Sequence, residues 1–145
     1  ELLHERIKIC KKLYLNNKKL EFISEIEENI IFKCDPHYIS HTFDNLIINA
    51  ISYCNDGIIK IDLQKQENNI LITIKDDGIG IPKEELQSIF GVFVVSSKTR
   101  TPAGGRGMGL ALCKKVIELH GGKIWAENDK QGKTAFVFTV PIVIP

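Results

Sequence analysis

Two asparagines one helical turn apart are the first residues whose type and spacing could do chemistry. Asn45 and Asn49 stand at i and i+4 of a predicted helix, and Ser52 and Tyr53 follow on the same face at i+7 and i+8. Asparagine is unfavourable inside a helix, so such a pair needs a reason. An amide oxygen is a neutral ligand that suits Mg²⁺ where phosphates supply the other oxygens. Taken alone, however, the pair is explained more simply by a solvated face of an asparagine-rich chain.

A second candidate is the loop Asp76-Asp77-Gly78-Ile79-Gly80, which directly follows a predicted strand. Glycine permits positive φ angles and the close approach of a planar ligand. A carboxylate beside it could accept a hydrogen bond from an exocyclic amine. An ordinary turn after a strand would have the same residues, so this loop alone is a weak signal.

A glycine-rich run, residues 104–110, immediately precedes a strongly periodic helix. Its backbone N–H groups and the positive end of the helix dipole predict an anion site, with phosphate as the expected ligand. The run lacks the Gly-Lys-Ser/Thr of a P-loop and the glycine spacing of a dinucleotide-binding motif. A flexible linker is a poorer explanation, because the run joins the helix without a gap.

The histidines and cysteines give weaker evidence for a functional site. His37 and His41 have the i, i+4 spacing of a zinc pair, but no third ligand accompanies them, so a zinc site is not favoured. His4 is expected to be an exposed helix residue, and His120 to end a helix. The four cysteines lie far apart among apolar neighbours, which predicts buried, reduced thiols at positions 10, 34, 54 and 113.

Composition limits the class of protein. The chain has 145 residues, 43% hydrophobic and 26% charged, with a net charge of +1. These values predict one globular domain, residues 1–145, and give no electrostatic reason to expect binding to nucleic acid or to a membrane. Because the first residue is Glu1 rather than Met, we expect a fragment of a longer protein.

The elements that must position these residues follow from periodicity. Asp35-Pro36 predicts a helix start, and an apolar stripe continues that helix to about Cys54. The predicted helices cover 1–18, 36–54, 83–89 and 107–120, and the predicted strands 20–23, 30–33, 59–63, 70–74, 123–127 and 134–140, with a loop at 91–105. Helices and strands do not alternate strictly, which indicates an α+β fold: a mixed sheet with helices on one face.

In this order, these segments resemble the ATP-binding catalytic domain of bacterial sensor histidine kinases, in the wider family that includes DNA gyrase, the MutL proteins and a heat-shock chaperone. The resemblance covers nearly the whole chain and implies the two-layer α/β sandwich known as the Bergerat fold. The matching segments are the N box (44–50), the first glycine box (76–82), the phenylalanine box (89–93), the second glycine box (105–112) and the closing strand (132–138).

For the base of the nucleotide, the resemblance implies that Asp76 accepts a hydrogen bond from the adenine N6 amine. Thr134 would reach the same ring edge through water, and Tyr53 would pack against adenine. The residues implied around the base are Tyr53, Asp76, Gly78, Gly80, Ile81 and Thr134.

For the phosphates, the resemblance implies that Asn49 is the Mg²⁺ ligand, with Asn45 one turn before it. The lid and second glycine box would supply the other contacts: Lys98, Thr99, Gly105, Arg106, Gly107, Met108, Gly109 and Leu110. Ser52 departs from the pattern, since related kinases often carry Lys or Arg there, and this implies a weaker grip on the phosphates.

One position bears on the reaction. Hydrolysing relatives carry a glutamate one turn before the metal-binding asparagine, as the base for water, whereas this chain has Asn45. An amide cannot accept a proton at neutral pH, which favours transfer to a protein over transfer to water.

The resemblance therefore implies a kinase domain that uses ATP and Mg²⁺ and gives the γ-phosphate to a histidine on a separate dimerisation and phosphoacceptor domain. Through that domain it would serve a response regulator in two-component signalling. The fragment is expected to be monomeric and cytoplasmic, and the full-length protein homodimeric. Attachment of the parent to the inner membrane stays open. The alternative is a degenerate nucleotide-binding or docking module without kinase activity.

Overall fold

The structure is a computed structural model that describes residues 2–14, 19–27, 34–54, 56–78, 80–90 and 109–142. Its α-helices are α1 (Leu2–Tyr14), α2 (Pro36–Tyr53) and α3 (Gly109–Leu119). Its strands are β1 (Lys19–Ile26), β2 (Asp56–Gln66), β3 (Asn69–Asp76), β4 (Lys123–Asn128) and β5 (Thr134–Pro141). Two 3₁₀ segments, η1 (Lys83–Glu85) and η2 (Ser88–Phe90), follow β3.

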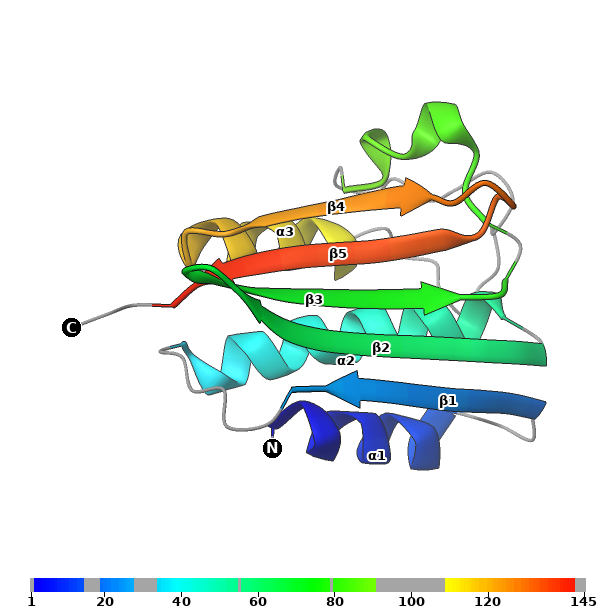
Figure 1. Cartoon of the computed structure of the whole chain (residues 1–145), viewed down its shortest axis with the longest axis horizontal. Coiled ribbons are helices and arrows are strands. Elements are labelled where there is room, and N and C mark those ends of the chain that lie inside the picture. Colours follow the sequence, from blue (N-terminus) through cyan, green and yellow to red (C-terminus); the bar gives the residue numbers. More distant parts are fainter. Residues whose placement is uncertain are drawn as a thin grey trace.

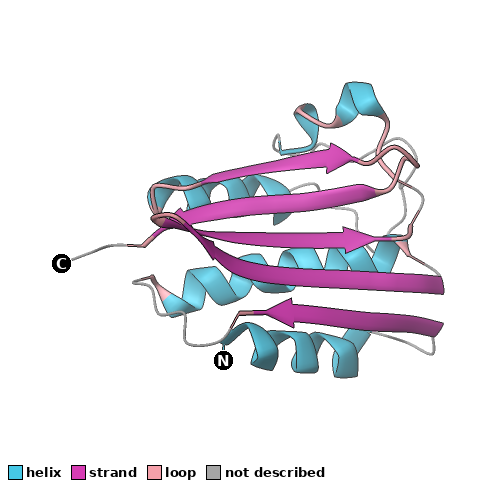
Figure 2. Cartoon of the chain, in the orientation of Figure 1, coloured by secondary structure: helices cyan, strands magenta, loops and turns pink. Residues whose placement is uncertain are grey.

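The strands form a five-stranded sheet in the order β1-β2-β3-β5-β4. β1 is parallel to β2, and the other neighbouring pairs are antiparallel. α2 and α3 cover one face of the sheet, and α1 packs against α2 beside the edge strand β1 (Figure 1 and Figure 2). This arrangement confirms the predicted fold class, a mixed and mainly antiparallel sheet with helices on one face.

The core lies between α2 and the sheet, as the apolar stripes predict. Burying one Val, Leu, Ile, Phe or Met side chain stabilises the fold by roughly 1.5–3 kcal/mol. The rings of Phe43 on α2 and Phe138 on β5 meet at 5.9 Å between centroids. The buried residues predicted from the stripes are Phe43, Leu46, Ile47, Ala50, Ile51, Cys54, Ile59, Ile61, Leu63, Ile70, Ile72 and Ile74.

α2 begins where the sequence predicts. Asp35 is its N-cap, and the carboxylate accepts from the backbone N–H of His37 and of Tyr38 at 3.0 and 3.3 Å. His120, just after α3, accepts the Asp35 N–H through Nε2 at 3.0 Å and therefore donates from Nδ1 to the Val116 carbonyl at 2.8 Å. His120 thus also ties the end of α3 to the start of α2.

α1 is tied to α2 by an ion pair. Arg6 donates from Nε to Asp44 Oδ1 at 2.8 Å and from Nη2 to Asp44 Oδ2 at 2.6 Å. The Cys10 thiol lies 3.6 Å from Asp44 Oδ1, and burial raises the pKa of this thiol to about 12. Such a two-pronged pair fixes both distance and orientation, so it holds α1 beside the turn of α2 that precedes Asn45.

The prediction for the first strand, residues 20–23, was too short. Ser24 and Glu25 also lie within β1 and pair with Ile61 and Asp62 of β2. β1 is an edge strand, so polar side chains can face solvent while the backbone pairs. Residues 30–33 lie outside the described part of the chain.

Two helix predictions also need correction. The segment predicted as one helix over 83–89 forms the 3₁₀ segments η1 and η2, separated by a turn, because so short a segment gains little from α-helical pairing. The first helix ends at Tyr14 rather than at residue 18, and residues 15–18 are not described.

The four cysteines carry free thiols, and Cys10, Cys54 and Cys113 are buried, as expected. Cys34 was also predicted to be buried, but it is partly exposed, because it lies just before the N-cap Asp35 and not within a helix or strand that packs on the core. Burial raises the pKa of the Cys113 thiol to about 12, which keeps it protonated and unreactive. None of the helices described is long and apolar enough to cross a membrane.

Candidate functional site

Asp76 and Thr134 meet at one edge of the sheet. Asp76 is the last residue of β3 and Thr134 the first of β5, and the pairing of these strands ends with Lys75 opposite Ala135. Both polar side chains are buried, with exposed fractions of 5% and 2%. The structure thus places at one edge of the sheet the two residues for which the resemblance implies a common role.

The Asp76 carboxylate is a buried charge with unused hydrogen-bonding capacity. Its Oδ1 accepts from the Gly78 N–H at 2.8 Å, and within the described residues no hydrogen bond reaches Oδ2. Burial is the main cause that raises the pKa of Asp76 to about 6, and the Gly78 N–H opposes it. A buried acceptor without a partner calls for an explanation, and a donor on a bound ligand would supply one.

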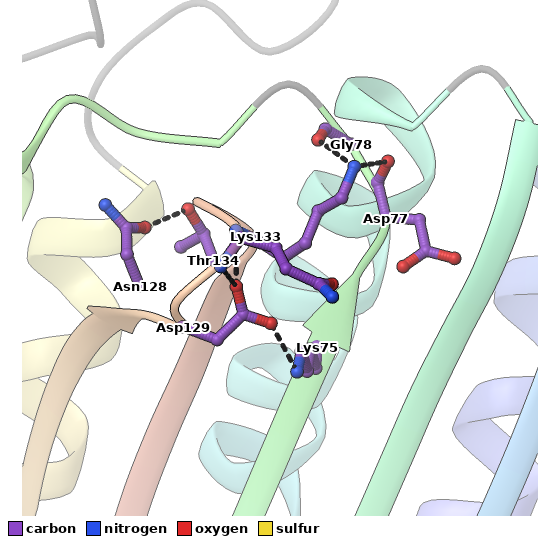
Figure 3. Close-up of polar contacts among 8 residues, drawn as sticks. Lys75, Asp77, Gly78, Asn128, Asp129, Lys133 and Thr134 are labelled. Atoms are coloured by element: carbon purple, nitrogen blue, oxygen red, sulfur yellow. Dashed lines mark hydrogen bonds and ion pairs between the residues drawn. The ribbon is translucent and has the colours of Figure 1, made fainter.

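The Thr134 hydroxyl belongs to a closed ring of hydrogen bonds. It accepts from the Ile81 N–H at 2.9 Å. It donates to Asn128 Oδ1 at 2.7 Å (Figure 3). Asn128 Nδ2 in turn donates to the Ile81 carbonyl at 2.7 Å. Because the hydroxyl proton is used toward Asn128, Thr134 can only accept from a further group, such as a water molecule.

Glycine is required at position 80, where the first glycine box contacts the β4–β5 turn beside Thr134. Its φ is +77°, and a Cβ there would stand 2.3 Å from the Gly132 carbonyl oxygen. Only glycine adopts this conformation without strain and allows the two loops to approach this closely. The glycine box therefore fixes the loop against the β4–β5 turn, with Ile81 buried behind it.

The β4–β5 turn is organised by Asp129. Its Oδ1 accepts from the N–H of Lys133 at 2.9 Å and of Gln131 at 2.8 Å, and its Oδ2 pairs with Lys75 Nζ at 2.7 Å. The pKa of Asp129 is lowered to about 2, chiefly by the bond from Lys75 and then by the Lys133 N–H. Lys133 Nζ donates to the Asp77 carbonyl at 3.0 Å, which joins this turn to the glycine box (Figure 3).

On the helix side, Asn45 contacts the start of α3. Its Nδ2 donates to the His41 carbonyl at 3.0 Å, and its Oδ1 would lie 2.6 Å from a Cβ on Gly109. Asn49 lies one turn further along α2, half-buried, and no hydrogen bond from another described residue reaches its side chain. The N box and the end of the second glycine box are therefore in contact, which the sequence could not show.

Several predicted residues are not placed. Lys98, Thr99, Gly105, Arg106, Gly107 and Met108 lie outside the described residues, and so does the side chain of Tyr53. Leu110 packs against the core from the first turn of α3. In the described ranges, no group of three or more His, Cys, Asp or Glu side chains could hold a metal ion by itself.

Sequence reasoning missed Asn128, Asp129 and Lys133 as parts of this site. Asn128 lies directly opposite Thr134 in the register of β4 and β5. The predicted strands 123–127 and 134–140 already put these two residues beside the turn that joins the strands, so their pairing was a usable signal. Lys133 gave no such signal, since its partners are backbone carbonyls of a distant loop.

Comparison with known proteins shows the family to which this chain belongs. Residues 34–144 match the family model of the histidine kinase-, DNA gyrase B-, and HSP90-like ATPases. The sensor histidine kinase WalK of Bacillus subtilis (strain 168) is 36% identical over 127 residues, which are 84% of this chain and 21% of that relative. The chain thus spans about a fifth of the length of this curated relative.

Solved structures of histidine kinase domains are similar to this chain as well. The catalytic domain of the histidine kinase ThkA, in a nucleotide-free form, is 30% identical with a TM-score of 0.81, over 98% of this chain and 93% of that one. A mycobacterial sensor histidine kinase, MprB, superposes with a TM-score of 0.86 at 22% identity, over 97% of this chain and 93% of that one, and this likeness concerns the fold.

Proposed function

Because the chain belongs to the family of histidine kinase-, DNA gyrase B- and HSP90-like ATPases, we propose that it binds Mg·ATP and donates the γ-phosphate to a histidine. That histidine would lie on a dimerisation and phosphoacceptor domain of the same longer protein. Through it, the chain would supply phosphate to a response regulator in two-component signalling. The chain itself would be the catalytic and ATP-binding domain.

The observation that carries this proposal is the buried carboxylate of Asp76, whose Oδ2 accepts no hydrogen bond from a residue that the structure describes. Such an oxygen suits an exocyclic amine, which the adenine ring presents at N6. A guanine ring presents a carbonyl oxygen at that position, and two acceptors would repel each other. The Thr134 hydroxyl, fixed as an acceptor, lies at the same edge of the sheet and would hold a water molecule against the ring.

The residues on α2 and α3 fit the phosphate end. Asn49 offers a neutral amide oxygen of the kind that Mg²⁺ accepts beside phosphate oxygens. Bound there, Mg²⁺ would neutralise charge on the phosphates. Gly109 opens α3, and its lack of a side chain leaves the Asn45 amide in contact with the helix start. Backbone N–H groups at this end of α3 would face the phosphates.

The transfer step needs little covalent chemistry from this chain. A lone pair on the acceptor imidazole attacks the γ-phosphorus, the bond to the bridging oxygen breaks, and its electron pair leaves with ADP. The imidazole loses its proton to solvent. Asn45 donates its amide hydrogen to His41 and cannot remove a proton from water, which favours the histidine as nucleophile over hydrolysis.

Calorimetric titration with Mg·ATP tests the binding step, with Asp76→Asn beside the wild type. A hydrogen bond to a charged group is worth about 1.5–3 kcal/mol, so we expect a loss of roughly 10- to 100-fold in affinity. Asp77→Asn is the matched control, because the neighbouring carboxylate is exposed and bonds to the Ile58 N–H. Equal losses in both variants, or wild-type affinity in Asp76→Asn, would contradict the adenine pocket.

The transfer step is tested separately, by mixing the chain with γ-labelled ATP and the phosphoacceptor domain of its parent protein. We expect label on the acceptor histidine, in a bond that is labile in acid and stable in base. Normal ATP binding without labelling would instead support a docking module that has lost kinase activity.

A further inference from the structure

A groove of about 420 Å³ opens between α1 and the edge strand β1, away from the candidate nucleotide site. One wall is a face of α1, and the other is the side of β1 that carries Phe22 and Ser24. Buried Ile7 gives the groove an apolar floor. Its lining residues are His4, Ile7, Lys8, Lys11, Lys12 and Ser24.

The polar lining of this groove is cationic. Lys8, Lys11 and Lys12 are exposed, and none forms an ion pair with any acid that the structure describes. Lys11 Nζ lies 5.0 Å from the centroid of the Phe22 ring, a cation–π contact that holds its ammonium at the wall. Three ammonium groups around a concave surface, none paired with a described acid, favour a ligand that brings negative charge.

The basic surface is short, and two acidic residues of β1 lie on the other face of that strand. His4 to Lys12 covers eight helical steps, or about 12 Å along α1. Glu21 and Glu25 alternate with Phe22 and Ser24, so they lie on the opposite face of β1. The whole chain has a net charge of only +1. A nucleic acid duplex or a membrane surface would need a wider basic area, whereas a few carboxylates on one peptide match this width.

α1 is held firmly in place, as a ligand-binding surface requires. Its buried residues Leu3, Ile7 and Cys10 pack into the core, and Arg6 holds Asp44 of α2 by two hydrogen bonds. The lysines therefore project from a fixed helix rather than from a loop, which reduces the ordering cost of binding.

From these observations we propose that the α1–β1 groove docks an acidic peptide segment of a partner protein. Carboxylates of the segment would pair with Lys8, Lys11 and Lys12, and a small apolar side chain would cover Ile7. This surface is independent of the nucleotide site, so the inference does not depend on ATP binding.

Fluorescence anisotropy of a short labelled peptide of alternating Glu and Ser tests the proposal with the whole chain. The groove variant carries Lys8→Glu, Lys11→Glu and Lys12→Glu. The matched control carries Lys114→Glu, Lys115→Glu and Lys123→Glu, exposed positions on α3 and β4 with the same change in net charge. We expect binding that weakens with salt, a loss of about tenfold or more in the groove variant, and a much smaller loss in the control.

A second variant with Gln at the three groove positions guards against misfolding of the charge-reversed protein, and it should also lose affinity. Equal losses in the groove variant and the matched control would mean attraction by net charge alone and would overturn the proposal. So would an absence of binding by the wild type, or tighter binding of duplex DNA or phosphatidylserine vesicles than of the peptide.

Discussion

The side-chain oxygen of Asn45 on α2 lies where Gly109, the first residue of α3, leaves room for it. A Cβ on Gly109 would stand 2.6 Å from Asn45 Oδ1, well inside contact distance. The amide cannot simply turn, because its Nδ2 donates to the His41 carbonyl at 3.0 Å. Gly109 therefore determines the position of Asn45, and through it the spacing between the N box and α3.

The first prediction concerns Gly109→Ala. Alanine is favourable in a helix, and the clash falls on the end of a side chain, so we expect the free energy of unfolding to change by less than about 1 kcal/mol. If the proposed site is correct, ATP affinity should fall several-fold, because Asn45 must leave its place beside the proposed phosphate end. Denaturant unfolding and calorimetric titration of the same protein samples separate the two effects.

Asn45→Ala and the double variant complete this experiment. If Gly109→Ala acts by displacing Asn45, it should have little further effect once that side chain is gone. The double-mutant cycle should then give a coupling free energy of about 1 kcal/mol or more in ATP binding. Additive losses would show that Gly109 acts on the phosphates directly.

The second prediction concerns the stability of the ligand-free protein. Burial raises the pKa of Asp76 from 3.8 to about 6, so the folded state holds this proton over a pH range in which the unfolded state has lost it. Stability therefore decreases as pH rises from about 4 to 6, and above 6 the charged group destabilises the fold by about 3 kcal/mol. Asp76→Asn, which can still accept the Gly78 N–H, should be more stable than wild type by up to that amount at pH 8.

Denaturant unfolding at pH 5 and pH 8 checks this, since the difference between the two proteins should shrink at the lower pH. Asp129→Asn is a control of opposite sign. The pKa of Asp129 is lowered to about 2 by Lys75 and the Lys133 N–H, so its stabilising effect is present above about pH 4 and is lost as pH falls toward 2. A destabilised Asp76→Asn protein at pH 8 would show that the carboxylate has a structural partner.

The third prediction concerns the pH dependence of ATP binding. The phosphates of ATP themselves titrate near neutral pH, which changes the affinity of every variant with pH. The pH dependence of the wild-type affinity alone therefore does not report on Asp76. The ratio of wild-type to Asp76→Asn affinity removes that shared effect. It should fall as pH decreases below about 6, where Asp76 takes up a proton and loses the charge that would strengthen the proposed bond to the N6 amine. A ratio independent of pH from 5 to 8 would exclude the ionised carboxylate as the group that binds adenine.

Much of the fold could be predicted because its signals are local. The Asp35-Pro36 start of α2, its apolar stripe and the alternation of β2 and β3 each lie within one segment and point to one arrangement. The parallel pairing of β1 could not be predicted in this way. The polar Ser24 and Glu25 resemble a connection, and only the edge position of β1 allows them to lie in a strand.

In the candidate site, too, local features could be predicted and contacts between distant segments could not. Asp76 and Asn49 could be selected by residue type, spacing and resemblance. The ring of Thr134, Ile81 and Asn128 and the contact of Gly109 with Asn45 depend on how distant segments meet. Such contacts are set by strand register and helix packing, which no single segment of the sequence specifies.

The fourth prediction concerns the Thr134 ring. Thr134→Val keeps the shape of the side chain but leaves the buried Ile81 N–H and Asn128 Oδ1 without partners, which should cost about 1–3 kcal/mol in the free energy of unfolding. Thr134→Ser keeps the hydroxyl and should lose less than half as much. If both variants lose equally, the methyl group rather than the hydrogen bonds stabilises this corner.

The last prediction concerns Arg6 and Asp44, the pair that joins α1 to α2. Their side chains are only 22% and 24% exposed, and the guanidinium donates to both carboxylate oxygens. A double-mutant cycle with Arg6→Leu and Asp44→Asn should therefore give a coupling free energy of about 1–2 kcal/mol in unfolding. The comparison pair is Lys60 with Glu25, which are 46% and 60% exposed at 3.5 Å. Exposed pairs of this kind contribute about 0–1 kcal/mol, and salt screens them. Unfolding at low and high salt should leave the first coupling largely intact and abolish the second, and equal couplings for the two pairs would mean that Arg6 does not anchor α1.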